Sequence, residues 1–492
     1  MLRPWGLPIQ IDADSRQPIY QQVATSIIVE IQRGRLKPGT ALPGTRALAK
    51  LLSLNRNTVA TAFEELIAQG WVVSEKSRGT FIARRLPRIV RNTAPARPAE
   101  LGATTRVERV GPQVVERLSP PRYSFADEGP DPRLDGDIDF QEAFRRAARA
   151  QYSSGWNYCD PRGASQLRGA LAEMLRTRRG VLAEPESILI TRGRQMALYL
   201  CAQAALGPGA VVAVEQPGQR RVWETFRVTG ARVVGVPVDE HGLQVEVLRR
   251  LSKLHPIRAV YVSPEHQYPT TVTMSARRRQ ELLQWAEETG AVILEDDLDH
   301  EYQYSWPSNL SLASQDKNDS VIYIGSFSRL LMPGLNLGFI AASERRVRKM
   351  AQLRSLIDRQ GESAMEMSVA QLIRGGKLQR RLAKTVDEYR DRRDLLASLL
   401  RRYLGSSVKV RVPSGGGALW VQPEQVVNTR SWCASAAELG VKFCCSSAYS
   451  LDEAANGGLR LGFTTMQPEE MEQAVQLLAD SYPGNVRLSN AS

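Results

Sequence analysis

An amphipathic helix is the first element that the hydrophobic pattern predicts. Apolar residues recur every four positions, and the helix can begin near Asp14-Ser15. These apolar residues are Ile19, Val23, Ile27 and Ile31. After a break at Lys37-Pro38-Gly39, a second short helix is expected to run through Leu52, with Thr45 as its N-cap.

A third helix and a hairpin follow this pair. Ser53-Leu54 forms the turn, and Asn55 can cap a helix whose inner face is apolar. That face consists of Val59, Ala62, Phe63 and Leu66. Two β-like runs, Trp71–Val73 and Thr80–Ile82, flank a polar turn at Ser77-Arg78-Gly79. Two helices joined by a tight turn and followed by a hairpin are typical of a winged helix-turn-helix, whose last helix enters the major groove of DNA.

The stretch from about residue 84 to about residue 122 shows no sustained apolar period. Six prolines interrupt a segment rich in Arg, Ala, Thr and Glu. This composition predicts an extended linker between two domains.

From about residue 123 onward, short apolar strands alternate with helices. The strands are apolar on both faces, as a buried and largely parallel sheet requires. The expected strands are Ile188–Ile190, Val211–Val214, Val233–Val236, Ala259–Val262, Ala291–Leu294, Val321–Ile324 and Leu337–Ile340. A smaller lobe is expected from about Leu382, with strands such as Leu419–Val421.

Composition narrows the class of protein. A chain of 492 residues fits two or three domains, and 42% hydrophobic with 24% charged residues is typical of globular proteins. No apolar run reaches the roughly 18–20 residues of a membrane span, and the N-terminus lacks the apolar core of a secretory signal. Five cysteines form no metal-type spacing. We therefore expect a cytoplasmic protein with no membrane association and no metal site.

The net charge is concentrated near the N-terminus. Residues 1–120 hold 18 Lys and Arg against 9 Asp and Glu, a net charge of +9 out of +13 for the whole chain. A basic terminal segment suits the neutralisation of phosphates, although a basic solvated surface alone would give the same count.

The N-terminal segments resemble the GntR-type bacterial DNA-binding domain. The matching segments are Arg35–Ala49, Asn55–Val59 and Phe63–Leu66. The resemblance implies double-stranded operator DNA as a partner, with Arg46 and Arg56 reading base edges. The other residues expected at this interface are Asn55, Asn57 and Thr58 of the third helix and Arg78, Gly79 and Thr80 of the wing.

The rest of the chain resembles the fold-type I aminotransferases. The matching segments are Tyr158–Gly163, Ile190–Gln195, Glu215–Gly218, Ser263–Thr270, Leu294–Asp299, Gly325–Arg329 and Gly458–Phe463. Their order, together with the GntR-like head, is similar to that of MocR-type regulators. The resemblance implies an α/β fold with a mostly parallel large lobe and a smaller α+β C-terminal lobe. It also implies a homodimer and, as the family's cofactor, pyridoxal phosphate.

Only part of the family's cofactor site is kept. Asp296 stands at the position that pairs with the pyridinium nitrogen, and Arg460 at the position that binds a substrate carboxylate. Arg221 also matches a basic position of the family.

The other cofactor positions are altered. By the resemblance, Arg329 replaces the Schiff-base lysine, Asn336 the phosphate-binding arginine and Leu298 a tyrosine. Gln219 replaces an aromatic residue, and Arg194 a small residue near the phosphate. A guanidinium stays protonated and has delocalised lone pairs, so Arg329 cannot form the covalent bond to the cofactor. Aminotransferase chemistry is therefore not expected.

Two interpretations of the altered cleft stay open. The cleft binds a different, anionic molecule, or Arg329 and Asp296 form a buried ion pair in an empty scaffold. A buried arginine cluster without a counter-ion would be costly, which favours the ligand. The residues expected in the pocket are Arg194, Arg221, His266, Tyr268, Asp296, Arg329, Asn336 and Arg460.

The sequence thus predicts a transcriptional regulator with three segments. These are a DNA-binding domain over residues 15–83, a linker over 84–122 and an aminotransferase-like domain for effector binding and dimerisation over 123–485. One alternative is an aminotransferase-like protein that binds pyridoxal phosphate, with residual enzymatic or cofactor-sensing activity. Another is a scaffold that only dimerises.

Overall fold

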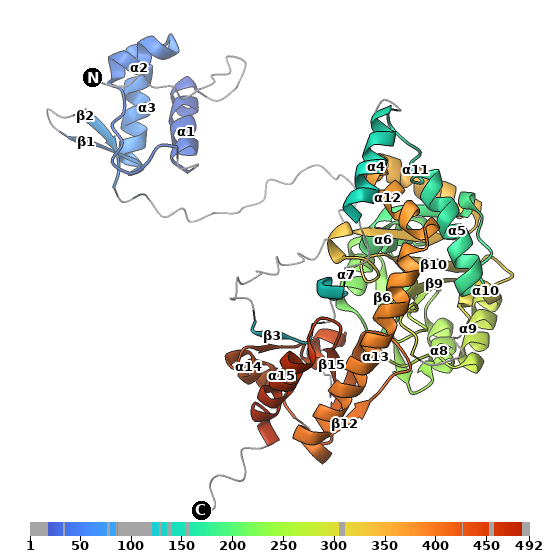
Figure 1. Ribbon diagram of the computed structural model, residues 1–492. Helices are drawn as coiled ribbons and strands as arrows, with labels where there is room; N and C mark the ends of the chain where they lie inside the picture. Colours follow the sequence, from blue (N-terminus) through green and yellow to red (C-terminus); the bar gives the residue numbers. More distant parts are fainter. Residues whose placement is uncertain are drawn as a thin grey trace, which may run out of the picture. The chain divides into compact units, whose positions relative to one another are not determined.

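The computed structural model describes residues 18–32, 35–75, 79–84, 86, 121–126, 129–134, 140–153, 157–304, 310–425, 427–451 and 457–484. The chain divides into two compact units, a small N-terminal unit and a large C-terminal unit (Figure 1). Nearly all of the expected linker lies outside the described residues. Of the helices within the described ranges, none is long and apolar enough to cross a membrane.

The N-terminal unit consists of three helices and a hairpin, as the sequence predicts. Its elements are α1 (Ile19–Gln32), α2 (Thr45–Leu52), α3 (Arg56–Ala68), β1 (Val72–Glu75) and β2 (Gly79–Ile82). The two strands are antiparallel, with Val73 opposite Phe81. Val23 and Ile27 of α1 pack with Val59 and Phe63 of α3 in one apolar core. The expected helix start at residues 14–15 lies outside the described residues.

The helix caps of this unit agree only in part with the sequence prediction. Asn55 caps α3, because its side-chain oxygen accepts a hydrogen bond from the backbone N–H of Asn57 at 2.9 Å. Ser53 adopts the left-handed conformation that ends α2. The prediction for Thr45 is wrong: Thr45 is the first helical residue of α2, and Gly44 is the N-cap, without a side-chain hydrogen bond.

An eight-stranded sheet forms the centre of the large unit and contains all seven predicted strands. Its order is β4-β11-β10-β9-β8-β5-β6-β7, and β10, β9, β8, β5 and β6 run parallel. β11 is antiparallel to both of its neighbours, and the short β7 is antiparallel to β6. The strands are β4 (Ile188–Arg192), β5 (Val211–Gln216), β6 (Arg232–Asp239), β7 (Gly242–Leu243), β8 (Ile257–Val262), β9 (Val292–Asp297), β10 (Val321–Ser326) and β11 (Leu337–Ala341).

Helices cover both faces of this sheet, which explains why its strands are apolar on both sides. One face packs on α6 (Gly193–Ala205), α7 (Arg220–Val228) and α11 (Glu344–Ile357). The other packs on α8 (Val245–Leu254), α9 (Ala276–Thr289) and α10 (Leu312–Gln315). Successive residues of a strand point to opposite faces, so Leu294 joins the first layer and Ile293 the second.

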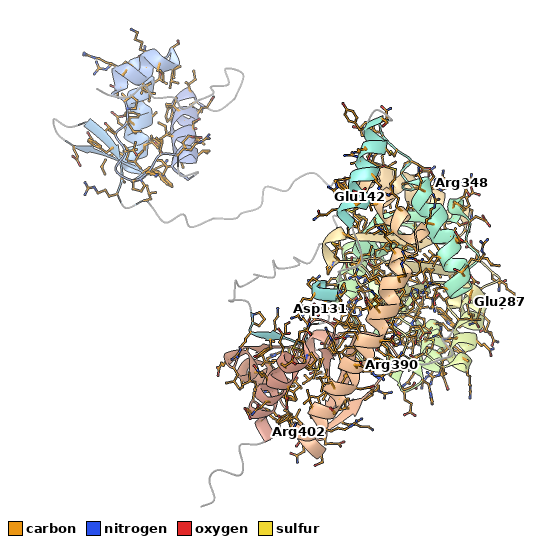
Figure 2. All side chains as sticks on the ribbon, viewed as in Figure 1. Asp131, Glu142, Glu287, Arg348, Arg390 and Arg402 are labelled. Carbon is orange, nitrogen blue, oxygen red and sulfur yellow. The ribbon has the colours of Figure 1, made fainter. Side chains whose placement is uncertain are left out.

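The remaining helices border the sheet and lead to the smaller lobe. They are α4 (Phe140–Ser153), α5 (Ser165–Arg179), α12 (Ser363–Arg374) and the long α13 (Lys377–Leu404). Leu382, where we expected the smaller lobe to begin, lies inside α13 and not between elements. Asp131, labelled in Figure 2, precedes this helix by more than 200 residues in the sequence. Its buried carboxylate binds the Arg392 guanidinium of α13 at 2.9 Å and so ties the start of the large unit to this helix.

The smaller lobe is a three-stranded antiparallel sheet with two covering helices. The sheet consists of β12 (Val408–Arg411), β13 (Ala418–Pro423) and β15 (Leu459–Gly462). Helix α14 (Thr429–Glu438) lies between β13 and β15 in the sequence, and α15 (Pro468–Asp480) follows β15. The early strand β3 (Tyr123–Ser124) pairs in parallel with β14 (Val441–Lys442). The first described residues of the large unit therefore belong to the smaller lobe, which the sequence pattern did not predict.

Candidate functional site

Four of the residues predicted to contact DNA are exposed at or near the start of two helices of the N-terminal unit. Arg46 in the first turn of α2 is exposed, as are Asn55, Arg56 and Asn57 at the start of α3. Thr58 is half-buried, and Arg78 lies outside the described residues.

The wing tip shows why one position calls for glycine. Gly79 has a positive φ of 114°, which a side chain would strain, and an added Cβ would meet open space. Gly79 is exposed and Thr80 is half-buried. The wing backbone is thus open to a partner, and DNA contact by these residues stays a prediction.

A buried carboxylate lies at the carboxyl end of β9 in the large unit. Asp296 is fully buried, and its Oδ2 accepts a hydrogen bond from the Tyr261 hydroxyl at 2.5 Å. The Arg194 guanidinium forms an ion pair with the same oxygen through Nη1 and donates to Gln219 Oε1 through Nη2. Burial opposes the charge of Arg194, but Asp296 raises the pKa of Arg194 above its ordinary value.

Local structure explains why these four side chains meet. Tyr261 lies opposite Leu294 on neighbouring parallel strands, so Tyr261 and Asp296 point to the same face of the sheet. Arg194 lies in the first turn of α6, and Gln219 is the N-cap residue of α7. Both helices pack on that face, so the cluster forms where the strands end and the helices begin.

Arg329 and Arg460 share a second buried carboxylate. Arg329 Nη1 lies 3.0 Å from Asp299 Oδ1, and Arg460 Nη2 lies 3.6 Å from Asp299 Oδ2. The Arg460 guanidinium also lies over the Tyr268 ring, 4.8 Å from its centroid. The alternative in which Arg329 pairs with Asp296 is therefore wrong, because Arg194 binds Asp296 and Arg329 binds Asp299.

His266 lies close by as a buried, neutral side chain. Neither ring nitrogen has a hydrogen-bond partner among the described residues. Burial lowers the pKa of His266 to about 3, so the imidazole is uncharged near neutral pH. The ring packs against Gly415 and Gly416, where an added Cβ would lie 2.4 Å from Nε2 and 3.1 Å from the His266 side chain, respectively.

Asn336 and Arg221 complete the set of predicted pocket residues. Asn336 is exposed in a left-handed conformation, and a Cβ added at Gly193 would lie 2.1 Å from its Oδ1. Arg221 is exposed in the first turn of α7, and its side chain forms no ion pair with the part of the chain that the structure describes. The structure therefore groups Arg194 with Asp296 and Arg329 with Arg460, but not Arg221 with either pair.

Sequence reasoning missed a third group of charges on the opposite face of β9. Asp297 binds the Arg179 guanidinium at 2.6 Å and accepts a hydrogen bond from the Tyr323 hydroxyl at 2.6 Å. His300 lies 3.3 Å from Asp297 and 2.9 Å from Glu301. Burial opposes its charge, but these carboxylates raise the pKa of His300 to about 9. The acidic run Glu295–Asp299 is the sequence signal that could have predicted this charged group.

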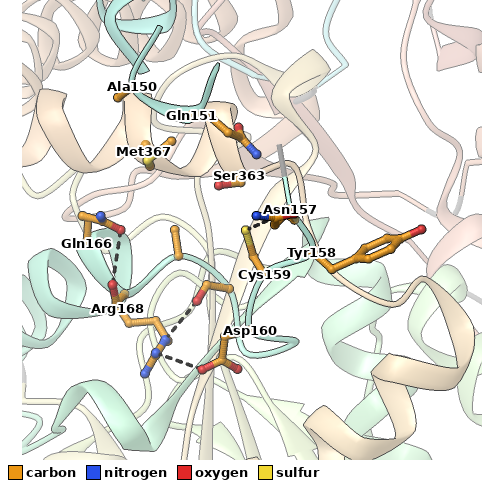
Figure 3. A pocket seen from close by; sticks show the side chains of 13 residues that line it. Ala150, Gln151, Asn157, Tyr158, Cys159, Asp160, Gln166, Arg168, Ser363 and Met367 are labelled. Carbon is orange, nitrogen blue, oxygen red and sulfur yellow. Dashed lines mark hydrogen bonds and ion pairs between the residues drawn. The ribbon is translucent and has the colours of Figure 1, made fainter. Parts of the chain in front are cut away.

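A separate pocket of about 600 Å³ lies between α4, α5 and α12 (Figure 3). Arg168 and Asp160 both line this pocket and form an ion pair, with Arg168 Nη2 at 3.3 Å from Asp160 Oδ2. Cys159 and Gln166 also line it, and none of the predicted cleft residues does. Among the described residues, no group of acidic, histidine or cysteine side chains could hold a metal ion.

Sequence profiles of two families match this chain. The family described as aminotransferase class I and II matches residues 131–478, and the family described as bacterial regulatory proteins, gntR family, matches residues 19–82. The two matches coincide with the two units of the fold.

Two transcriptional regulators are similar to this chain over most of its length, and an aminotransferase is similar in structure to most of it. The chain is 28% identical to the probable rhizopine catabolism regulatory protein MocR of Rhizobium meliloti, over 96% of this chain and 95% of that protein. It is 31% identical to the HTH-type transcriptional regulator TauR of Rhodobacter capsulatus, over 84% of this chain and 85% of that protein. The kynurenine aminotransferase of Pyrococcus horikoshii is similar in structure, with a TM-score of 0.67 and 26% identity over 74% of this chain and 91% of that chain.

Proposed function

Because the chain belongs to the MocR-type transcriptional regulators of the GntR family, which carry an aminotransferase-like domain, we propose that it binds operator DNA and senses a small anionic effector without a covalent cofactor. It acts as a regulator and not as an aminotransferase. The observation that carries the proposal is the Arg329 guanidinium bound to Asp299, at the position where the resemblance expects the Schiff-base lysine.

The geometry of the N-terminal unit supports sequence-specific DNA binding. The exposed start of α3 presents Arg56 and Asn57 to the surroundings, and Arg46 is exposed at the start of α2. An Arg side chain can bond the two acceptors of guanine in the major groove. The wing backbone at Gly79 then lies close enough to the sugar-phosphate chain for a contact that a larger residue would obstruct.

The residues of the cleft do not fit pyridoxal phosphate. Arg329 offers no neutral amine, and Asp296, which by the resemblance would pair with the pyridinium nitrogen, already binds Arg194 through Oδ2. Asn336, at the position of the phosphate-binding arginine, is uncharged. Loss of that charge-assisted contact removes about 1.5–3 kcal/mol of binding.

Charge favours an anion as the effector. Arg329 and Arg460 bring two positive charges to the carboxylate of Asp299, and Arg460 is buried over the Tyr268 ring. A bound carboxylate would accept hydrogen bonds from these guanidinium groups. The neutral His266 adds a polar side chain without adding charge.

The whole chain is proposed as a homodimer that binds two half-sites. Residues 15–83 form the DNA-binding domain, 84–122 the linker and 123–485 the effector-binding and dimerisation domain. Effector binding shifts the population of arrangements in which both heads can bind DNA together. The proposed setting is the cytoplasm, where the operator is found.

A covalent-adduct measurement tests the cofactor part of this proposal. The purified protein is mixed with pyridoxal phosphate, treated with borohydride and weighed as an intact chain. We expect no stoichiometric adduct. One cofactor bound covalently per chain, through any lysine, would overturn the proposal in favour of a cofactor-binding protein with residual enzymatic or sensing activity.

Operator affinity tests the effector part. Binding of the chain to its operator is measured with and without a panel of small carboxylates and phosphates. An affinity that changes with one of them supports the sensor. An affinity that none of them changes would favour a scaffold that only dimerises.

A further inference from the structure

The site that would hold the pyridine ring of the cofactor contains a side chain of the protein itself. We propose that Arg194 is a built-in counter-ion that takes the place of the pyridinium group on Asp296, so that Arg194, and not only the change at position 329, closes the site to pyridoxal phosphate.

The first step of the argument is the bonding of Asp296. This fully buried carboxylate needs a positive partner, because an unpaired charge away from water is costly. Arg194 supplies that partner through Nη1, and the Tyr261 hydroxyl donates to the same oxygen at 2.5 Å. The other oxygen, Oδ1, is buried and accepts no hydrogen bond from the described residues, so a pyridinium nitrogen there would meet a carboxylate whose charge Arg194 already neutralises.

The second step is the way in which Arg194 is held. Its other terminal nitrogen, Nη2, donates to Gln219 Oε1, so the planar guanidinium is fixed at both ends. Gln219 itself replaces the aromatic residue that the resemblance expects there. The changes at positions 194 and 219 therefore act together: Arg194 occupies the space beside Asp296, and Gln219 holds the Arg194 guanidinium in place.

The third step is the direction from which Arg194 enters. Gly193 and Arg194 form the start of α6, where the resemblance expects a small residue near the phosphate. A small side chain at position 194 would leave open the space between the N-terminus of α6 and the Asp296 carboxylate. Arg192, two residues earlier, is exposed and binds Glu362 at 2.6 Å, so it leaves the cleft unobstructed.

This inference concerns the large unit alone and does not depend on DNA binding or on the identity of the effector. It makes a separate demand on the altered cleft: restoring the lysine is not sufficient to restore the cofactor.

Four variants test this demand with pyridoxal phosphate as the probe. They are Arg329→Lys, the double variant Arg194→Ser/Arg329→Lys, the matched control Arg192→Ser/Arg329→Lys, and the single variant Arg194→Ser. After borohydride reduction, the adduct at position 329 is located and quantified by peptide mass mapping. We expect the double variant to form at least about tenfold more adduct than Arg329→Lys alone, and the Arg192 control to match Arg329→Lys.

A non-covalent readout keeps the test valid if the serine variants are less stable. Pyridoxamine phosphate is added to the wild type, Arg194→Ser and the larger, uncharged Arg194→Gln, and the melting temperature is followed. We expect a rise with ligand only in the two Arg194 variants.

Two outcomes would overturn the proposal. One is an adduct in Arg329→Lys as abundant as in the double variant. The other is a folded double variant that forms no adduct, together with Arg194 variants that pyridoxamine phosphate does not stabilise.

Discussion

At the scale of single residues, the arginines of the cleft are divided between two buried carboxylates. Arg194 neutralises Asp296, and Arg329 and Arg460 share Asp299. Asp299 therefore links these two guanidinium groups.

Replacing Asp299 tests how strongly the buried pair depends on it. In Asp299→Asn the buried Arg460 and the half-buried Arg329 lose their shared counter-ion, so we expect a loss of about 3–5 kcal/mol in the free energy of unfolding. The measurement is urea unfolding with and without added sulfate, which should stabilise the variant more than the wild type. The control is Asp387→Asn, which breaks an exposed pair with Arg390 worth about 0–1 kcal/mol. Equal losses in both variants would contradict this account.

His300 predicts a pH dependence of stability. Its pKa is raised from 6.5 to about 9, so its contribution is complete below pH 6.5 and is lost as the pH rises through about 9. Between about pH 6.5 and pH 9, we expect the free energy of unfolding of the wild type to fall by about 3 kcal/mol more than that of His300→Gln. The measurement is urea unfolding as a function of pH. His241→Gln, at an exposed site, should behave like the wild type. An unchanged pH profile in His300→Gln would show that the histidine carries no such charge.

At the scale of elements, the N-cap residue of helix α3 has a structural role and a proposed role in DNA binding. Asn55 caps the helix through the Asn57 N–H and also lies on the surface expected to meet DNA. A substitution of this residue can therefore weaken the fold, the binding or both.

Two substitutions of Asn55 separate the roles. Asn55→Ala removes the cap and should cost about 1 kcal/mol, seen as faster hydrogen exchange of the first amides of α3. Asn55→Asp keeps a capping oxygen and restores protection, but its negative charge should weaken DNA binding. If Asn55→Ala leaves the exchange rates unchanged, the cap contributes little to the helix.

The elements were largely predictable from the sequence, whereas the pairing of charges was not. Apolar runs that are buried on both faces identify strands, and all seven expected strands are present, most of them longer at one or both ends. The strand β3 was missed because its two residues carry no period. Which aspartate binds Arg329 depends on the turn after β9. In this turn side chains no longer alternate between the two faces of the sheet, so the sequence spacing does not predict where the Asp299 side chain points.

At the scale of the whole molecule, the two units account for the uneven charge. Residues 1–120 carry +9 of the net +13, and within this segment the structure describes a winged helix-turn-helix with an exposed basic residue at the start of two helices. The large unit, which contains the ion pairs between arginine and aspartate, is the unit in which we propose that an effector controls DNA binding. Binding DNA and sensing an effector are thus assigned to different units of one chain.

The measurement that tests the central claim most directly is genome-wide mapping of the DNA bound by the wild type and by Arg56→Ala. We predict a limited set of sites that share a paired half-site in the wild type. These sites should be lost or redistributed in the variant, since removing one base-reading arginine costs about 1–3 kcal/mol. A wild type without enriched sites, or an Arg56→Ala variant with the same sites at the same occupancy, would contradict the account.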